Sequence, residues 1–129
     1  MGRSWESRVA EYVDSDRLSQ RLKAGNVIMC NVAGNSGNYH TETGLKTDRK
    51  SNCTCPSDYF PCKHVAALKE TYRLRPRSFA DLDRIMAKLA KNDKAALLKL
   101  VRQMILRAPE ALDALGVKGF EKEEPDYDY

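Results

Sequence analysis

The stretch that decides the fold is Cys53-Thr54-Cys55-Pro56-Ser57-Asp58-Tyr59-Phe60-Pro61-Cys62-Lys63-His64. It holds three of the four cysteines and one of the two histidines in this 129-residue chain. Cys53 and Cys55 are two residues apart, so on an extended strand both side chains project from the same face. The prolines at 56 and 61 limit the conformational entropy that is lost when the turn between them closes. Two segments of the chain can therefore bring four side chains to one point.

These four side chains favour a single zinc ion held by Cys53, Cys55, Cys62 and His64. Zinc prefers four sulfur and nitrogen ligands in a tetrahedron. Cys62 stands just before a predicted helix, whose N-terminus stabilises a thiolate. Because three thiolates and one imidazole fill every position around the ion, the site is closed to substrate. The pattern thus predicts a structural ion rather than a catalytic one.

Two other interpretations of the cysteines stay open. They could be buried apolar residues, although the residues around Cys53 and Cys55 are polar and offer no core. They could also form a redox pair, which would make the chain a thiol oxidoreductase, although the common redox spacing is Cys-x-x-Cys. Cys30 and His40 could form a catalytic dyad, but no third group or oxyanion hole accompanies them. We expect Cys30 to be a small core residue and the chain not to be an enzyme.

The residues that precede the motif predict a small antiparallel sheet. A helix or turn is expected over 5–12, with Trp5, Val9 and Tyr12 facing inward. Strands are expected over 17–22, 27–32, 38–43 and 50–53, separated by glycine-rich turns. After Pro61, apolar residues at helical spacing predict a helix that runs to residue 72. The fold class is therefore α+β.

The residues that follow predict a helical extension. Ser78 is expected to cap one helix, with Asp81 at the capping-box position, and Asn92 is expected to cap the next. A last short helix is expected over 109–115. The predicted organisation is an N-terminal segment at 1–25, a zinc finger at 26–72, a basic linker at 73–78, a helical extension at 79–118 and a disordered acidic tail at 119–129.

The metal motif resembles the SWIM-type zinc finger. The resemblance rests on Asn52-Cys53-Thr54-Cys55-Pro56 and on Pro61-Cys62-Lys63-His64-Val65-Ala66-Ala67-Leu68, with a preceding hairpin and a following helix. It implies a ββα finger, and the later sequence is similar to the tails of small stand-alone prokaryotic members. Fingers of this type accompany transposases, helicase-like ATPases, a kinase and mediators that pair with RecA-type paralogues. The resemblance implies binding to nucleic acid or to protein without choosing between them.

The charge distribution favours a polyanionic partner. The net charge is +4, but residues 1–120 carry +8 because the tail is acidic. Phosphate contacts would make binding depend on salt. We expect nucleic acid, DNA in preference to RNA, to contact Lys46, Arg49, Lys50, Lys63, Lys69, Arg73, Arg75 and Arg77. The other reading of these charges is a solvated surface, with Arg73, Arg75 and Arg77 paired to the acidic tail or capping helix ends.

A protein adaptor is the alternative function. The extension has more apolar residues than a small hairpin can bury, so some could face a protein partner, for example a RecA-type recombinase paralogue or another DNA-processing enzyme. No apolar run is long enough to span a membrane, and the first residues lack the apolar segment of a signal peptide. We therefore expect a cytoplasmic protein with no membrane contact and no small-molecule substrate.

Overall fold

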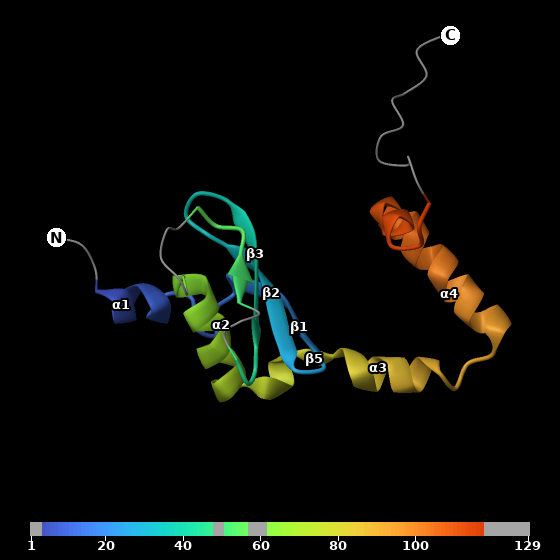
Figure 1. Cartoon of the computed structure of the whole chain (residues 1–129), viewed down its shortest axis with the longest axis horizontal. Coiled ribbons are helices and arrows are strands. Elements are labelled where there is room, and N and C mark those ends of the chain that lie inside the picture. The colour runs from blue at the N-terminus through green and yellow to red at the C-terminus, as the bar shows by residue number, and fades with distance from the viewer. Residues whose placement is uncertain (1–3, 48–50, 57–61, 118–129) are drawn as a thin grey trace, which may run out of the picture. The chain divides into compact units, whose positions relative to one another are not determined.

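The computed structural model describes residues 4–47, 51–56 and 62–117, and Figure 1 shows an α+β chain. It forms two compact units, Met1–Met86 and Ala87–Tyr129. The strands are β1 (Leu18–Ala24), β2 (Val27–Ala33), β3 (Asn38–Gly44), β4 (Asn52–Cys53) and β5 (Ala80–Asp81). The helices are α1 (Trp5–Ala10), α2 (Lys63–Leu74), α3 (Leu82–Leu89) and α4 (Lys94–Arg107), with 3-10 turns η2 (Pro76–Ser78) and η3 (Pro109–Asp113). The predicted acidic tail lies outside the described residues.

The five strands form one mixed sheet in the order β4-β3-β2-β1-β5. The strands from β4 to β1 are antiparallel to their neighbours, while β5 pairs with β1 in parallel. The strands predicted over 27–32 and 38–43 are confirmed, and each runs one residue further. Gly25 turns the chain from β1 into β2 with a φ of +60°. Glycine adopts this left-handed backbone without steric cost, which is why it suits the turn.

The hydrophobic core lies between one face of the sheet and α2, which Figure 1 shows beside β3 and β2. Side chains alternate between the two faces along β2, so every second residue from Ile28 to Val32 points to this face and forms the centre of the core. From α2, Leu68 is fully buried against them. The whole buried cluster consists of Tyr12, Leu18, Ile28, Cys30, Val32, Ala67, Leu68 and Phe79. This core fixes α2, and with it the second half of the metal motif, against the sheet.

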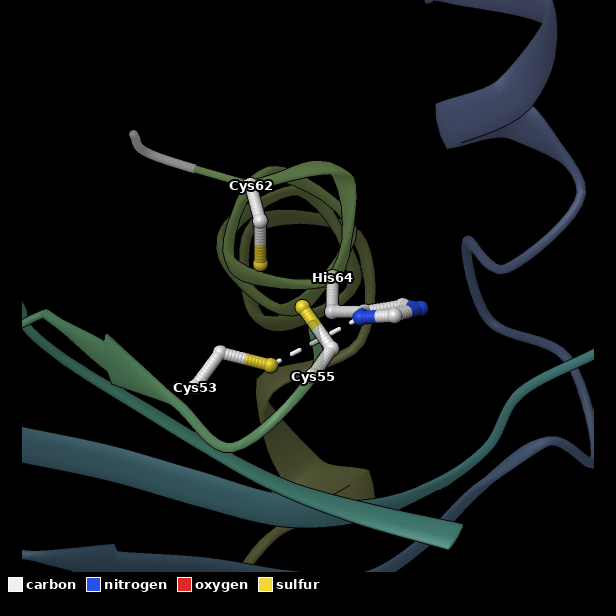
Figure 2. Close-up of side chains that lie close together, drawn as sticks. All are labelled: Cys53, Cys55, Cys62 and His64. Atoms are coloured by element: carbon white, nitrogen blue, oxygen red, sulfur yellow. Dashed lines mark hydrogen bonds between the residues drawn. The ribbon is translucent and has the colours of Figure 1, made fainter. Parts of the chain in front are cut away.

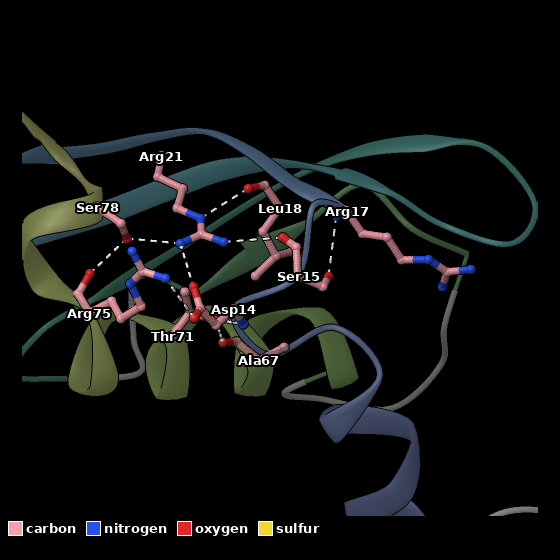
Figure 3. A network of polar contacts seen from close by, with 9 residues as sticks. All are labelled: Asp14, Ser15, Arg17, Leu18, Arg21, Ala67, Thr71, Arg75 and Ser78. Atoms are coloured by element: carbon pink, nitrogen blue, oxygen red, sulfur yellow. Dashed lines mark hydrogen bonds and ion pairs between the residues drawn. The ribbon is translucent and has the colours of Figure 1, made fainter.

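A polar network ties the turn after α1 to the C-terminal end of α2 (Figure 3). The backbone N–H of Asp14 donates to Thr71 Oγ1 at 2.9 Å, and its carboxylate accepts from Arg21 at 3.0 Å and from Arg75 at 3.3 Å. Arg21 also donates to Ser78 Oγ at 2.8 Å. The Arg21 hydrogen bond, with a smaller contribution from Arg75, holds the pKa of Asp14 below its usual value against the opposing effect of burial. The network therefore joins chain segments about 60 residues apart in the sequence.

The predicted start of the helix after residue 78 was wrong. Phe79 is buried and lies edge-on to Tyr72, with ring centroids 5.2 Å apart. Ala80 and Asp81 then form β5, so α3 begins only at Leu82. Asp81 still caps this helix, because its carboxylate accepts from the backbone N–H of Arg84 at 3.2 Å. Burial of Phe79 and pairing with β1 outweigh the local helix signal.

Two further details differ from the sequence expectation. Asp93, not Asn92, caps α4, and its side chain accepts from the backbone N–H of Ala96 at 2.8 Å. The first helix ends at Ala10, and Trp5 is 43% exposed instead of facing inward. Tyr12 is buried as expected, but from a turn rather than a helix. Short N-terminal helices contribute little by themselves, so the buried tyrosine anchors this segment.

Candidate metal centre

Strand pairing positions the first two cysteines. β4 pairs with the middle of β3, where Cys53 lies opposite Thr41. The next residue, Thr54, binds the backbone of His40 in both directions: its N–H donates to the His40 carbonyl, and its hydroxyl accepts from the His40 N–H, both at 3.0 Å. These bonds hold the Cys53–Cys55 segment at the edge of the sheet. Cys55 follows directly and lies half-buried beside Cys53.

The N-terminus of α2 positions the other two ligands. Cys62 is the N-cap residue, with extended backbone at φ −75° and ψ 168°, and its side chain makes no capping hydrogen bond. The thiol is therefore available to a metal ion. His64 lies in the first turn of the helix and is only 3% exposed. A ligand pair at a helix start is rigid because the core holds α2 in place.

The four side chains converge on one point, as Figure 2 shows. The Sγ atoms of Cys53, Cys55 and Cys62 and a ring nitrogen of His64 all lie within 4.8 Å of one another. Cys53 Sγ and His64 Nδ1 are 3.6 Å apart. Zinc bonds of about 2.0–2.3 Å at tetrahedral angles place ligand atoms about 3.5–3.8 Å apart. The 3.6 Å pair matches this spacing, and all four ligand atoms lie close enough together to hold one zinc ion.

The electrostatics of the cluster already favour a bound cation. The hydrogen bond from the Cys53 thiol lowers the pKa of Cys62 to about 3, against the opposing effect of burial. The His64 side chain and the backbone N–H groups of Val65 and His64 contribute to this lowering of the pKa. The same thiol pair, together with burial, raises the pKa of Cys53 far above its usual value. Cys62 is thus a thiolate at neutral pH, and Cys53 supplies the proton that a zinc ion would displace.

Two tyrosines enclose the histidine ligand. The ring of Tyr12 lies edge-on to His64, with centroids 4.9 Å apart and an interplanar angle of 86°. Tyr39 stacks on His64 at 5.6 Å and 29°. Nδ1 faces the cysteines, while Nε2 is buried and has no hydrogen-bond partner among the described residues. The geometry therefore assigns Nδ1 as the ligand atom. Sequence reasoning did not connect either tyrosine with the site, although Tyr39 alternates with the buried Thr41 and Thr43 along β3.

A family model described as SWIM zinc finger matches residues 43–73. The match spans β4, all four candidate ligands and nearly all of α2. The chain carries a SWIM zinc finger. Comparisons with curated proteins and with solved structures found no match. Together with the Cys3His cluster, the match identifies a zinc-binding module whose four ligands are positioned for one ion.

The basic residues predicted to contact nucleic acid differ from one another in burial and in their contacts. Arg49 and Lys50 lie outside the described residues. Lys46 is exposed after β3, whereas Lys63 is half-buried, with Nζ 5.4 Å from the centre of the Tyr12 ring. Lys69 is half-buried in the middle of α2. These lysines therefore do not form one continuous patch on α2 itself.

The three arginines lie close in sequence: Arg73 in the last turn of α2, Arg75 directly after the helix and Arg77 in η2. Arg73 donates to both carboxylate oxygens of Glu70, one turn earlier. Arg75 contacts Asp14, which Arg21 also binds. Arg77 is exposed and makes no side-chain hydrogen bond or ion pair with the residues that the structure describes. The arginines thus differ in how firmly the protein itself holds them.

The remaining cysteine and histidine lie on opposite faces of the sheet. Cys30 is 1% exposed and faces α2, and burial raises the pKa of its thiol to about 12. Its neighbour Asn31 points the other way and pairs with His40 across the strands. His40 Nδ1 lies 3.3 Å from Asn31 Oδ1, and Nε2 lies 3.6 Å from Glu42. The two residues therefore form no dyad, and the core role predicted for Cys30 is confirmed. No helix among the described residues is long and apolar enough to cross a membrane.

Proposed function

We propose that this chain is a non-catalytic, zinc-stabilised module of the cytoplasm that contacts nucleic acid, with DNA favoured, through the C-terminal end of α2. The reducing cytoplasm keeps the cysteines available as ligands. The observation that carries the proposal is the occurrence of Arg73, Arg75 and Arg77 within five residues at the end of α2 and in η2. The side chains of Arg73 and Arg75 are 67% and 64% exposed. Guanidinium groups bind phosphate in a bidentate manner, so a cluster of them suits a nucleic-acid backbone.

Arg75 can turn to a phosphate at small cost. Its contact with Asp14 is an exposed ion pair, and such pairs contribute little to stability. When Arg75 leaves, Asp14 keeps its 3.0 Å contact with Arg21, so no carboxylate is left alone. Arg77 has no competing acid among the described residues. These two arginines are therefore the strongest candidates for phosphate contact.

Arg73 is expected to contribute less. Glu70 engages it through two carboxylate oxygens, and the pair holds the pKa of Glu70 low, chiefly through these hydrogen bonds. A phosphate would have to replace a neighbouring carboxylate that stays in place on the same helix. The local charge that Arg73 offers is thus largely neutralised. Arg73 is paired with an acid and Arg77 is not, among the described residues, so comparing substitutions of the two arginines tests the proposal.

The closed donor set supports a structural role for the metal. Three cysteines and one histidine fill the tetrahedron, so a bound zinc ion would have no open position for water or substrate. The ion would hold the edge of the sheet to the start of α2. This in turn would fix the C-terminal end of the same helix, where the arginines lie. In this proposal the metal shapes the binding surface and takes no part in it.

The test is a salt series of fluorescence-anisotropy binding to labelled single-stranded DNA, double-stranded DNA and RNA. Protein with one zinc ion per chain is compared with R75Q/R77Q, with R73Q and with the control K99Q on α4. We expect the double variant to lower the slope of log affinity against log salt by about 2, one for each lost phosphate contact. R73Q and K99Q should change it little. Equal slopes for all variants would overturn this surface, and no binding at low salt would overturn the function.

A further inference from the structure

Helix α4 presents a broad apolar face that its own unit does not cover. At about 100° per residue, six side chains fall on one side of the helix. They are Leu97, Leu98, Leu100, Val101, Met104 and Ile105. Leu98 is 58% exposed and Met104 is 63% exposed. No residue of α4 or of η3 is buried.

A helix of this length needs a surface to pack against. α4 has 14 residues, and isolated helices of about 12–15 residues are marginal in water. The contact with η3 leaves Leu97 and Ile105 only half-buried. In proteins most helix stability comes from packing of the apolar face. The exposed face of α4 is therefore a surface that a partner would complete.

The charges around this face select the kind of partner. α4 has four basic residues and no acidic one, whereas the acids among residues 87–117 are Asp93, its N-cap, and Glu110 and Asp113 of η3. The basic residues in this range are Lys88, Lys91, Lys94, Lys99, Arg102 and Arg107. None makes an ion pair or side-chain hydrogen bond with the described residues. An acidic partner would gain by pairing with these basic side chains.

Two of these charges flank the apolar face. Arg102 follows Leu98 by four residues, and Arg107 follows Leu100 by seven, so each lies beside one edge of the stripe. Lys99 lies on the opposite side of the helix, about 200° around from Leu97. A second copy of α4 would bring like charges together along both edges. The flanking arginines thus disfavour self-association and favour acidic residues along the edges of the partner.

We propose that α4 is a docking helix for an acidic amphipathic helix of a partner protein. The helix is about 21 Å long, which is two heptads and enough for a helix pair. Leucine, valine, isoleucine and methionine suit such packing, and residues 82–117 contain no aromatic side chain of the kind that anchors helices at a membrane interface. The docking surface contains none of the arginines proposed to contact nucleic acid. It stands or falls independently of nucleic-acid binding.

The experiment uses the full zinc-loaded chain and a labelled synthetic helix with a leucine stripe flanked by glutamates. Two control peptides are used: one has the same composition scrambled so that no stripe forms, and one has lysine in place of glutamate. We expect the acidic amphipathic peptide to bind at least ten times more tightly than either control. L98Q/M104Q should weaken binding at least tenfold. L106Q should not, because Leu106 is 64% exposed on the other side of the helix.

A charge exchange provides the sharper arm of the test. R102E/R107E should no longer bind the acidic peptide and should bind the lysine peptide instead. K99E, on the side of α4 opposite the apolar face, should still prefer the acidic peptide. Far-UV circular dichroism and zinc content check that each variant is folded. Equal binding of all peptides would overturn the proposal. So would dimerisation through Leu98 in light scattering, or binding to anionic lipid vesicles without binding to the acidic peptide.

Discussion

The ring of Tyr12 lies edge-on to the imidazole of His64, with centroids 4.9 Å apart. One residue is a metal ligand inside the SWIM match at 43–73, and the other precedes that match by about thirty residues. Tyr12 is fully buried and also contacts Arg17 and Lys63 through its ring. It therefore helps fix the orientation of His64 from outside the recognised motif. Residues that orient a ligand commonly influence metal affinity about 10–100-fold.

Two substitutions of Tyr12 should distinguish the contribution of its ring from that of its hydroxyl. Tyr12→Ala removes the ring from a filled core, which costs about 3–5 kcal/mol for an aromatic residue and should lower zinc affinity at least tenfold. Tyr12→Phe keeps the ring, and the hydroxyl it removes has no partner among the described residues. This variant should retain its zinc affinity and its stability. Competition with a chromophoric zinc chelator measures the affinity, and equal losses for both variants would contradict the role of the ring.

Loss of a single zinc ligand should unfold the finger. Cys62→Ser or His64→Ala removes one of four ligands that join the sheet edge to α2, and structural zinc contributes about 10–16 kcal/mol of apparent binding free energy in such small domains. Thermal melting followed by circular dichroism should show loss of the cooperative transition, with residual helix from α3 and α4. Cys30→Ala, outside the site, is the matched control and should keep one zinc ion per chain. Unchanged melting of the ligand variants would refute the structural role.

Zinc affinity should rise with pH across the neutral range. The pKa of Cys62 is lowered to about 3 by its hydrogen bond from Cys53, so this thiolate is ready at pH 6. The pKa of Cys53 is raised by the same bond and by burial, so zinc must displace its proton. Raising the pH makes that displacement easier, and the apparent log affinity should increase by about one or more per pH unit. Proton release on zinc addition, measured in weak buffer with an indicator dye, checks the sign, and proton uptake would contradict it.

The Asp14 network should contribute stability that acid removes. The pKa of Asp14 lies below its reference value of 3.8, chiefly because of Arg21, so the carboxylate stabilises the folded state above that pH. This contribution is lost as the pH falls through the lowered value. Asp14 also has a φ of +49°, which asparagine tolerates better than alanine. Urea unfolding at neutral pH measures the free energy of unfolding of each variant. This free energy should be lowest for Asp14→Ala, higher for Asp14→Asn and highest for Arg75→Ala. The reverse order would show that Arg75, not Arg21, is the main partner.

The metal centre could be predicted because its four ligands lie close together in the sequence. Cys53, Cys55, Cys62 and His64 lie within twelve residues, and both the strand and the helix that bear them have clear sequence patterns. Zinc chemistry then leaves few arrangements of such ligands. Tyr12 could not be assigned to the site in the same way. Its contact with His64 depends on how the chain folds over more than fifty residues.

The parts that could not be predicted depend on tertiary contacts. Ser78 and Asp81 have the spacing of a capping box, but Phe79 enters the core and draws the next two residues into the sheet. Likewise, Arg73 and Arg75 are basic in sequence, yet each has an acidic neighbour in the fold. The alternative that the sequence offered was pairing with the acidic tail, not with Glu70 or Asp14. Only the fold shows which arginine has which partner.

The parallel pairing of β5 with β1 shows that the cooperative folding unit is larger than the zinc motif. A fragment that ended at residue 73, where the family match ends, would lack Phe79 and would leave Leu22 and Lys23 unpaired on the outer edge of β1. Exposed strand edges promote aggregation between molecules. The two residues of β5 thus occupy part of the edge of β1 and prevent a strand of another molecule from pairing there. A fragment that retains residue 81 should remain monomeric at concentrations where the shorter one precipitates.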